Sequence, residues 1–320
     1  MMLRSLKPGT TAMMTTKLKK NKYLIVVAGP TAIGKTALGV QLARHFDTDV
    51  ISADSRQFFR EMSIGTAKPN AEEMQSVTHH FINSHSIAES YNVGKYETGA
   101  IALLDTLFRE KDFVVMVGGS GLYIDAVCKG FDELPEASRE IREKIETMLK
   151  NEGIEGLQHL LKELDPVYYG QVDLQNPQRI GRALEVCLAT GGPYSGLRKG
   201  KAKERDFNII KTGLNTSRET LYARINKRVD EMMAQGLLEE VKNLTAYKNA
   251  NALQTVGYKE LFDHLENKTD LQTAVELIKQ NTRKFAKRQL TWFRRDPEMK
   301  WFEPGEIKQI IDYITEELKN

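Results

Sequence analysis

The chain is organised around the stretch Tyr23-Leu-Ile-Val-Val-Ala-Gly-Pro-Thr-Ala-Ile-Gly-Lys-Thr-Ala-Leu38. A short apolar run that ends at glycine predicts a strand buried on both faces. The next eight residues fit the pattern G-x-x-x-x-G-K-[ST], and a helix is predicted after them. In such a loop, backbone N–H groups surround phosphate oxygens, a lysine adds positive charge, and the hydroxyl can bind Mg²⁺. We therefore predict a polyphosphate site of the nucleotide-binding P-loop type, formed by Gly29, Pro30, Thr31, Ala32, Ile33, Gly34, Lys35 and Thr36, with Thr36 as the metal ligand.

Composition excludes several classes of protein. The chain has 320 residues, of which 28% are charged, and its formal net charge is +3. A charge this small does not by itself indicate a nucleic-acid-binding protein. Cys128 and Cys187 are isolated, so we expect two reduced thiols and no zinc site. No apolar run approaches the length of a membrane span, and we expect a cytoplasmic monomer without membrane contact.

The amino-terminal residues form a separate segment in the sequence. Residues 1–21 contain no Asp or Glu and include a weak resemblance to an organellar transit segment. Because Arg4 is its only arginine, we interpret the segment as a disordered basic leader. A start at Met13 or Met14 is the other interpretation.

Polar residues follow two further predicted strands. Asp54 comes just after the strand Asp49–Ala53, and Ser120 lies in a glycine turn after the strand Phe113–Val117. Open parallel sheets bind their ligands at the carboxyl ends of their strands. Asp54 is therefore a candidate for proton transfer or for holding Mg²⁺ through water, with a helix N-cap as the structural alternative. The loop Met62–Pro69 could bring a hydroxyl and a lysine to the same cleft.

The pattern changes along the rest of the chain. Residues 131–206 read as amphipathic helices without a buried strand, over Ser138–Lys150, Leu157–Leu164 and Pro177–Thr190. The strand Asn208–Leu214 then returns to the sheet. We predict an α/β fold, with a parallel sheet flanked by helices in residues 22–130 and 207–320 and a helical insertion in residues 131–206.

The carboxyl-terminal part carries a basic helix. No acidic residue occurs from Lys279 to Arg295, and Lys284, Lys287, Arg288 and Arg295 fall on one helical stripe. We expect Phe285 and Phe293 to pack on the core from a neighbouring face. Since Gln289, Thr291 and Trp292 lie among the charges, the stretch favours binding to a phosphate backbone over a merely solvated surface. His79, His80 and His85 have no carboxylate or cysteine at ligand spacing, which favours structural or surface roles.

Taken in order, seven motifs resemble those of the tRNA dimethylallyltransferase family, bacterial type. The resemblance covers about residues 22–302. Its motifs are Gly29–Thr36, Asp54-Ser-Arg-Gln57, Met62-Ser-Ile-Gly-Thr-Ala-Lys-Pro69, Gly118-Gly-Ser-Gly-Leu-Tyr123, Asn176-Pro-Gln-Arg179, Val256-Gly-Tyr-Lys-Glu260 and Ala286-Lys-Arg-Gln-Leu-Thr-Trp292.

The resemblance implies both a reaction and a set of residues. It implies transfer of a dimethylallyl group from dimethylallyl diphosphate to N6 of the adenosine 3′ of the anticodon in tRNA, with Mg²⁺ as cofactor. Asp54 resembles the general base, Ser120 the hydroxyl beside the reacting centre, and Lys35 and Arg228 the diphosphate contacts. Where the family more usually has Thr, this chain has Ser120, which keeps the hydroxyl. The implied contacts to the tRNA anticodon loop are Asp54, Ser55, Arg56, Gln57, Arg142, Gln178, Arg179, Arg182, Lys259, Lys287, Arg288 and Arg294.

Other functions remain open from the residues alone. An isopentenyltransferase acting on free adenylates would share the P-loop and Asp54 but would have little use for the helical insertion. A small-molecule kinase with a P-loop leaves both the insertion and the basic helix unexplained. A non-catalytic RNA-binding protein is the remaining alternative.

Overall fold

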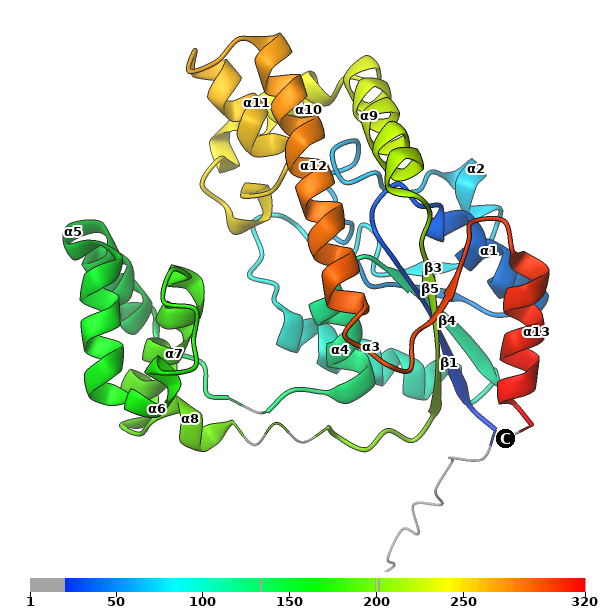
Figure 1. The fold of residues 1–320 in the computed structure, drawn as a ribbon, viewed down its shortest axis with the longest axis horizontal. Helices are drawn as coiled ribbons and strands as arrows, with labels where there is room; N and C mark the ends of the chain where they lie inside the picture. Colours follow the sequence, from blue (N-terminus) through cyan, green and yellow to red (C-terminus); the bar gives the residue numbers. More distant parts are fainter. Residues whose placement is uncertain (1–20, 133, 199, 201, 320) are drawn as a thin grey trace, which may run out of the picture. The chain divides into compact units, whose positions relative to one another are not determined.

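The computed structural model describes residues 21–132, 134–198, 200 and 202–319. Its centre is a parallel sheet of six strands in the order β3-β2-β4-β1-β5-β6 (Figure 1). The α/β prediction is confirmed. The strands are β1 Tyr23–Ala28, β2 Val50–Ser52, β3 His79–His80, β4 Phe113–Gly118, β5 Asn208–Leu214 and β6 Lys300–Phe302.

The two strands that the sequence analysis did not predict, β3 and β6, lie at the edges of the sheet. They have two and three residues and carry no fully buried side chain, so a pattern of buried apolar residues does not reveal them. His79 and His80, for which a structural or surface role was favoured over a metal site, form β3. The His80 ring lies 2.8 Å from a carboxylate oxygen of Asp49.

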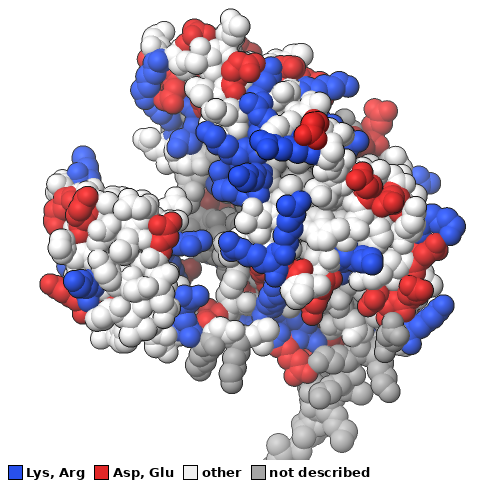
Figure 2. Space-filling model, in the orientation of Figure 1, with Lys and Arg blue, Asp and Glu red and all other residues white. Residues whose placement is uncertain are grey.

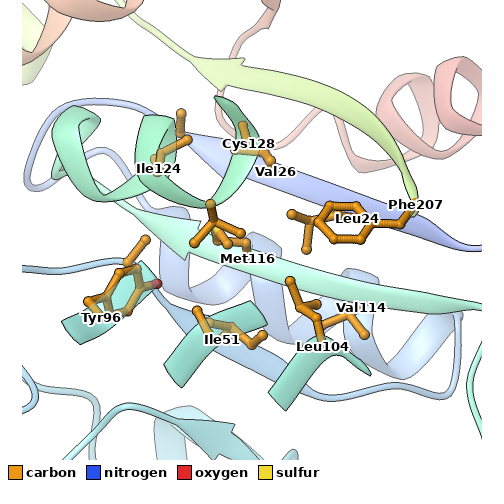
Figure 3. Close-up of a cluster of buried hydrophobic side chains, with 14 of the residues drawn as sticks. Leu24, Val26, Ile51, Tyr96, Leu104, Val114, Met116, Ile124, Cys128 and Phe207 are labelled. Carbon is orange, nitrogen blue, oxygen red and sulfur yellow. The ribbon is translucent and has the colours of Figure 1, made fainter. Parts of the chain in front are cut away.

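Side chains of β1 alternate between the two faces of the sheet. Leu24 and Val26 enter one apolar cluster with helices α3 Val93–Leu107 and α4 Gly121–Lys129 (Figure 3). Ile25 and Val27 enter the other. All four side chains are fully buried. The apolar run of β1 is thus buried on both faces, as a central parallel strand requires.

The second face of the sheet is covered by α1 Lys35–His45, α9 Arg218–Ala234 and α13 Ile307–Glu317. A third apolar cluster joins the end of α9 to α10 Leu237–Asn243, α11 Tyr258–Leu265 and α12 Leu271–Phe293. The remaining short helices of this part are α2 Ala71–Met74, η1 Thr245–Tyr247 and η2 Asn251–Leu253.

The chain divides into two compact units. The larger contains the residues up to Cys128 and those from Arg205 onward, and the smaller is Lys129–Glu204. The smaller unit consists of α5 Arg139–Leu164, α6 Pro166–Tyr169, α7 Pro177–Thr190 and α8 Tyr194–Leu197 around its own apolar cluster.

Two of the helices predicted in the smaller unit belong to one element. Ser138–Lys150 and Leu157–Leu164 are both parts of α5, which has non-helical dihedral angles at Gly153 (φ 71°). The third, α7, has the predicted bounds Pro177–Thr190. Asn176 caps its start by accepting the N–H of Arg179, and Gly191 in the left-handed region ends it.

Three expectations concern features outside the sheet. The predicted basic leader lies almost entirely outside the described residues. Cys128 and Cys187 are buried free thiols. In the part of the chain that the structure describes, every helix is too short or too polar to span a bilayer.

Candidate active site

A cleft of about 710 Å³ opens where β1, β2 and β4 end, within the larger unit. The loop after β1 contributes the P-loop, the loop after β2 contributes Asp54, and the loop after β4 contributes Ser120. Helices α9 and α12 complete its walls with side chains such as Arg228 and Phe285. Residues from five distant parts of the sequence thus meet at the carboxyl ends of parallel strands, where such sheets bind ligands.

The P-loop has a backbone conformation that depends on glycine. Gly34 adopts φ 102° at the N-cap of α1, a region that residues with a side chain rarely enter. Lys35 Nζ donates to the carbonyl of Pro30 at 2.6 Å. Burial, assisted by the positive charge of Arg228 and opposed by Asp54, lowers the pKa of Lys35 to about 7. A lysine in this state is prepared to gain a proton when an anion enters.

Arg228 and Thr36 face the cleft with unused donors. Arg228 is half-buried and its guanidinium donates no hydrogen bond to any described residue. Burial lowers its pKa, although Glu73 and Glu231 oppose the change. A buried cation without a hydrogen-bonded partner is costly. The site therefore favours an anionic ligand at the P-loop.

Asp54 has two roles that its two oxygens can share. Oδ1 accepts the N–H of Arg56 at 2.9 Å and that of Gln57 at 3.3 Å. These bonds cap a turn, and no helix begins here, so the helix N-cap considered as the alternative is wrong. Within the described part of the chain, Oδ2 makes no hydrogen bond. Ser120 Oγ accepts the N–H of Ser55 at 3.0 Å. The loops after β2 and β4 are therefore joined, and Asp54 keeps one oxygen for chemistry in the cleft.

The neighbours of Asp54 are engaged inside the protein. Gln57 Nε2 donates to the carbonyls of Thr66 (3.2 Å) and Ala67 (3.1 Å). Burial lowers the pKa of Arg56, whose guanidinium also donates to the carbonyl of Ser55 at 3.3 Å. Both side chains line the cleft, and their contact with RNA stays a prediction. In the protein alone, Gln57 holds the loop Met62–Pro69.

That loop does line the cleft, but the side chains of Thr66 and Lys68 turn inward. The Thr66 hydroxyl donates to the carbonyl of Met62 at 2.8 Å. Lys68 Nζ donates to the carbonyl of Phe59 at 2.7 Å and to Asn83 Oδ1 at 2.6 Å. Burial lowers the pKa of Lys68 to about 8. Hydrogen bonds therefore hold this loop in place as one wall of the cleft, and Lys68 is hydrogen-bonded within the protein.

The structure corrects the prediction for α12 at three residues. Gln289 is 7% exposed, with its amide bonded to the P-loop and to the loop after β4, and it cannot contact a phosphate backbone. Trp292 is half-buried and its Nε1 donates to Asp125 at 2.8 Å. Phe285, expected in the core, is 38% exposed and lines the cleft, whereas Phe293 is buried as predicted. The buried face of α12 therefore includes Gln289, and Phe285 lies outside it.

The tRNA contacts predicted on α11 and at the end of α12 are solvent-exposed. Lys259 on α11, and Lys287, Arg288 and Arg294 at the end of α12, are all exposed. Figure 2 shows Lys and Arg side chains gathered along the face over which α12 runs. This distribution fits a phosphate-binding surface.

In the smaller unit the predicted contacts differ from one another. Arg142 on α5, with Gln178 and Arg179 at the start of α7, is exposed. Arg182 is half-buried and is paired with Glu185 at 2.9 Å, and it also donates to the carbonyl of Pro135. Arg182 is therefore partly engaged within its own unit.

The sequence analysis did not predict that Gln289 and Glu240 support the loops around the cleft. Gln289 follows Ala286 by three positions and precedes Phe293 by four, a spacing that places it on the buried face of α12. That spacing was the available signal. Glu240 on α10 binds backbone N–H groups of the loop after β2. Nothing local in the sequence marks it.

Comparison with known proteins identifies the family. The family described as IPP transferase matches residues 57–296. A tRNA dimethylallyltransferase of Christiangramia forsetii is 54% identical over 93% of this chain and 99% of its own length. The chain belongs to the tRNA dimethylallyltransferase family. Another member, from Flavobacterium johnsoniae, is 51% identical over 93% of this chain and 99% of its own.

Solved members of the family share the fold. A full-length tRNA isopentenylpyrophosphate transferase of Bacillus halodurans has a TM-score of 0.69 and 36% identity, over 94% of this chain and 97% of its own. A eukaryotic dimethylallyltransferase, in a study of its action on tRNA, has a TM-score of 0.74 and 27% identity, over 90% of this chain and 75% of its own. As a member of this family the chain is a prenyltransferase with a P-loop-type parallel sheet.

Proposed function

We propose that this chain transfers the dimethylallyl group of dimethylallyl diphosphate to N6 of the adenosine 3′ of the anticodon in cytoplasmic tRNA. The observation that carries the proposal is the meeting of anion-binding and carboxylate groups in one cleft. Lys35 and Arg228 supply the positive charge, and Asp54 supplies the carboxylate. A P-loop kinase would share the first feature. The basic surface of α12 beside the cleft favours an RNA acceptor.

The reaction follows from these groups. The N6 amine forms a bond to the allylic carbon while the bond from that carbon to the diphosphate oxygen breaks. An exocyclic amine is a poor nucleophile, so Asp54 accepts its proton as the new bond forms. Lys35 and Arg228 neutralise the charge of the departing diphosphate. The released products are the prenylated tRNA and diphosphate.

Mg²⁺ fits the donors at the P-loop. Thr36 lines the cleft and its hydroxyl makes no hydrogen bond to another described residue, and Asp54 lines the same cleft. In the described part of the chain, no group of three or more His, Cys, Asp or Glu side chains could form a cage for a metal. Few protein ligands are typical of Mg²⁺ held mainly by substrate phosphates and water. Bound there, the ion would supply further charge neutralisation for the leaving diphosphate.

Acceptor competition tests the proposal. Transfer of labelled prenyl from dimethylallyl diphosphate is measured with tRNA, AMP and ATP as acceptors. We expect product only with tRNA, a requirement for Mg²⁺, and inhibition by pyrophosphate that is competitive with the donor. Transfer to AMP or ATP at a comparable rate would indicate a free-nucleotide enzyme. ATP hydrolysis stimulated by tRNA at the rate of transfer would indicate the kinase-like alternative.

A further inference from the structure

Two motifs that have no role in the reaction as proposed meet at one carboxylate. They are the loop Met62–Pro69 and the segment Val256–Glu260, which lie almost 200 positions apart. Glu240 of α10 lies between them. Its carboxylate accepts four hydrogen bonds, from the backbone N–H groups of Ser63 (3.0 Å), Ile64 (2.7 Å) and Gly65 (3.0 Å) and from the hydroxyl of Tyr258 (2.6 Å).

This arrangement is stronger than an ordinary loop contact. Successive backbone N–H groups form a concave anion site, and a carboxylate within it makes charge-assisted hydrogen bonds. The ring of Tyr258 closes the arrangement from the other side. A Cβ atom at Gly65 would lie only 2.5 Å from that ring, so the loop and α11 have no room between them. Glu240 therefore joins the loop, α10 and the start of α11.

The same loop is also held from its carbonyl side. Gln57 Nε2 bonds the carbonyls of Thr66 and Ala67, and Ala67 adopts φ 48°, an unfavourable value for a residue with a side chain. Strained backbone persists only where the surroundings over-determine it. The loop is thus held in a conformation that it would not keep alone.

The joined segments contribute apolar side chains to the cleft wall. Ile64 comes from the loop and Val256 from the segment before α11. Leu237, at the start of α10, is fully buried behind them in the same apolar cluster. On α9, Met232 extends this wall to one helical turn from Arg228. An apolar wall thus begins beside the arginine that would hold the diphosphate. A group attached to that diphosphate would lie against it.

We propose that Glu240 is a positioning residue that holds this apolar wall in place and thereby limits the length of the prenyl chain that the cleft accepts. The inference rests on the proposed function, since it assigns the wall to the prenyl group of the diphosphate donor. Without Glu240, three backbone N–H groups and one hydroxyl lose their acceptor. The loop then moves away from α10 and the wall opens.

Donor competition provides the test. Dimethylallyl diphosphate and the longer geranyl diphosphate are offered to the enzyme with tRNA, and the ratio of their kcat/KM values is compared between variants. In Glu240→Gln, we expect the preference for the shorter donor to fall by about tenfold or more, because one methylene group in an apolar pocket already discriminates by roughly 10- to 200-fold. The matched control is Glu239→Gln, on the same helix, whose exposed carboxylate pairs with Lys242.

Two milder variants keep the test valid if Glu240→Gln does not fold. Tyr258→Phe removes one hydrogen bond and keeps the ring, and Ile64→Ala widens the wall directly. Both should also lower the preference for the shorter donor. An unchanged donor ratio in folded variants, or a change confined to the KM for tRNA, would overturn the inference. Failure of the unsubstituted protein to transfer any prenyl group would instead remove the proposed function, and this is seen before any variant is compared.

Discussion

The side chain of Gln289 accepts the backbone N–H of Thr31 at 2.9 Å, although 258 positions separate the two residues. The same amide donates to the carbonyl of Gly119 at 2.8 Å. Gln289 therefore links the P-loop to the loop that carries Ser120. Because Lys287 and Arg288 lie on the exposed side of the same turn of α12, one helix connects the basic surface with the P-loop.

Replacing Gln289 by Ala should impair turnover far more than tRNA binding. The change leaves a backbone N–H and a carbonyl without partners and lets two catalytic loops shift. A displacement of about 1 Å can cost roughly 100-fold in rate. Single-turnover transfer and tRNA affinity measured in parallel will show this. Thr291→Ala, an exposed change on the same helix, is the control, and an equal loss in both variants would exclude a bracing role for Gln289.

Replacing Asp54 by Asn isolates the proton-transfer role from the capping role. Asn retains an oxygen that can accept the N–H groups of Arg56 and Gln57, so the loop should keep its shape, while the base is lost. We expect the rate of transfer at saturating substrates to fall by about 100-fold or more, with tRNA still bound. Turnover near that of the unsubstituted protein would remove Asp54 from the mechanism.

Binding of diphosphate should take up a proton above neutral pH. In the free protein the pKa of Lys35 is about 7, so at pH 8 most molecules carry a neutral Lys35. The negative diphosphate favours the ammonium form and raises this pKa in the complex. The affinity for diphosphate should therefore weaken as the pH rises through about 7. Below that pH, Lys35 is already protonated in the free protein and no longer makes the affinity depend on pH.

Calorimetry in buffers of different ionisation enthalpy measures that proton directly. We expect an uptake at pH 8 that approaches one proton and becomes small at pH 6. Lys35→Arg, which stays protonated throughout, should abolish the uptake at pH 8. Equal uptake by both proteins would assign the proton to another group.

The exposed basic residues of α12 should act on affinity for tRNA and leave the chemistry unchanged. Lys287→Ala combined with Arg288→Ala should reduce the slope of log affinity against log salt by about one to two units. Each phosphate that the protein no longer contacts keeps its counterion, so fewer counterions are released on binding. Turnover at saturating tRNA should change little. Lys308→Ala on α13 with Lys319→Ala just after that helix removes the same charge and should leave the slope unaltered. Identical slopes for the two double variants would show that the stripe is only a solvated surface.

Some of these features were predictable because their causes are local. The apolar run of β1, the glycine-lysine pattern after it and the helix Pro177–Thr190 each depend on neighbouring residues. Asp54 and Ser120 could be placed at the cleft because both follow buried strands, and parallel strands bring their carboxyl ends to one edge. The edge strand Lys300–Phe302 has no such local signal, since its pairing with β5 supplies its structure.

The sequence by itself determined the buried strands, the phosphate-binding loop and the order of the family's motifs, since each depends on residue type and short-range spacing. Only the tertiary structure decided that Gln289 supports the P-loop instead of RNA, and that Glu240 holds the loop at Ser63–Gly65. Both are hydrogen bonds between residues more than 170 positions apart. Short-range spacing shows which side of a helix is buried, but it does not show which distant backbone group lies opposite that side.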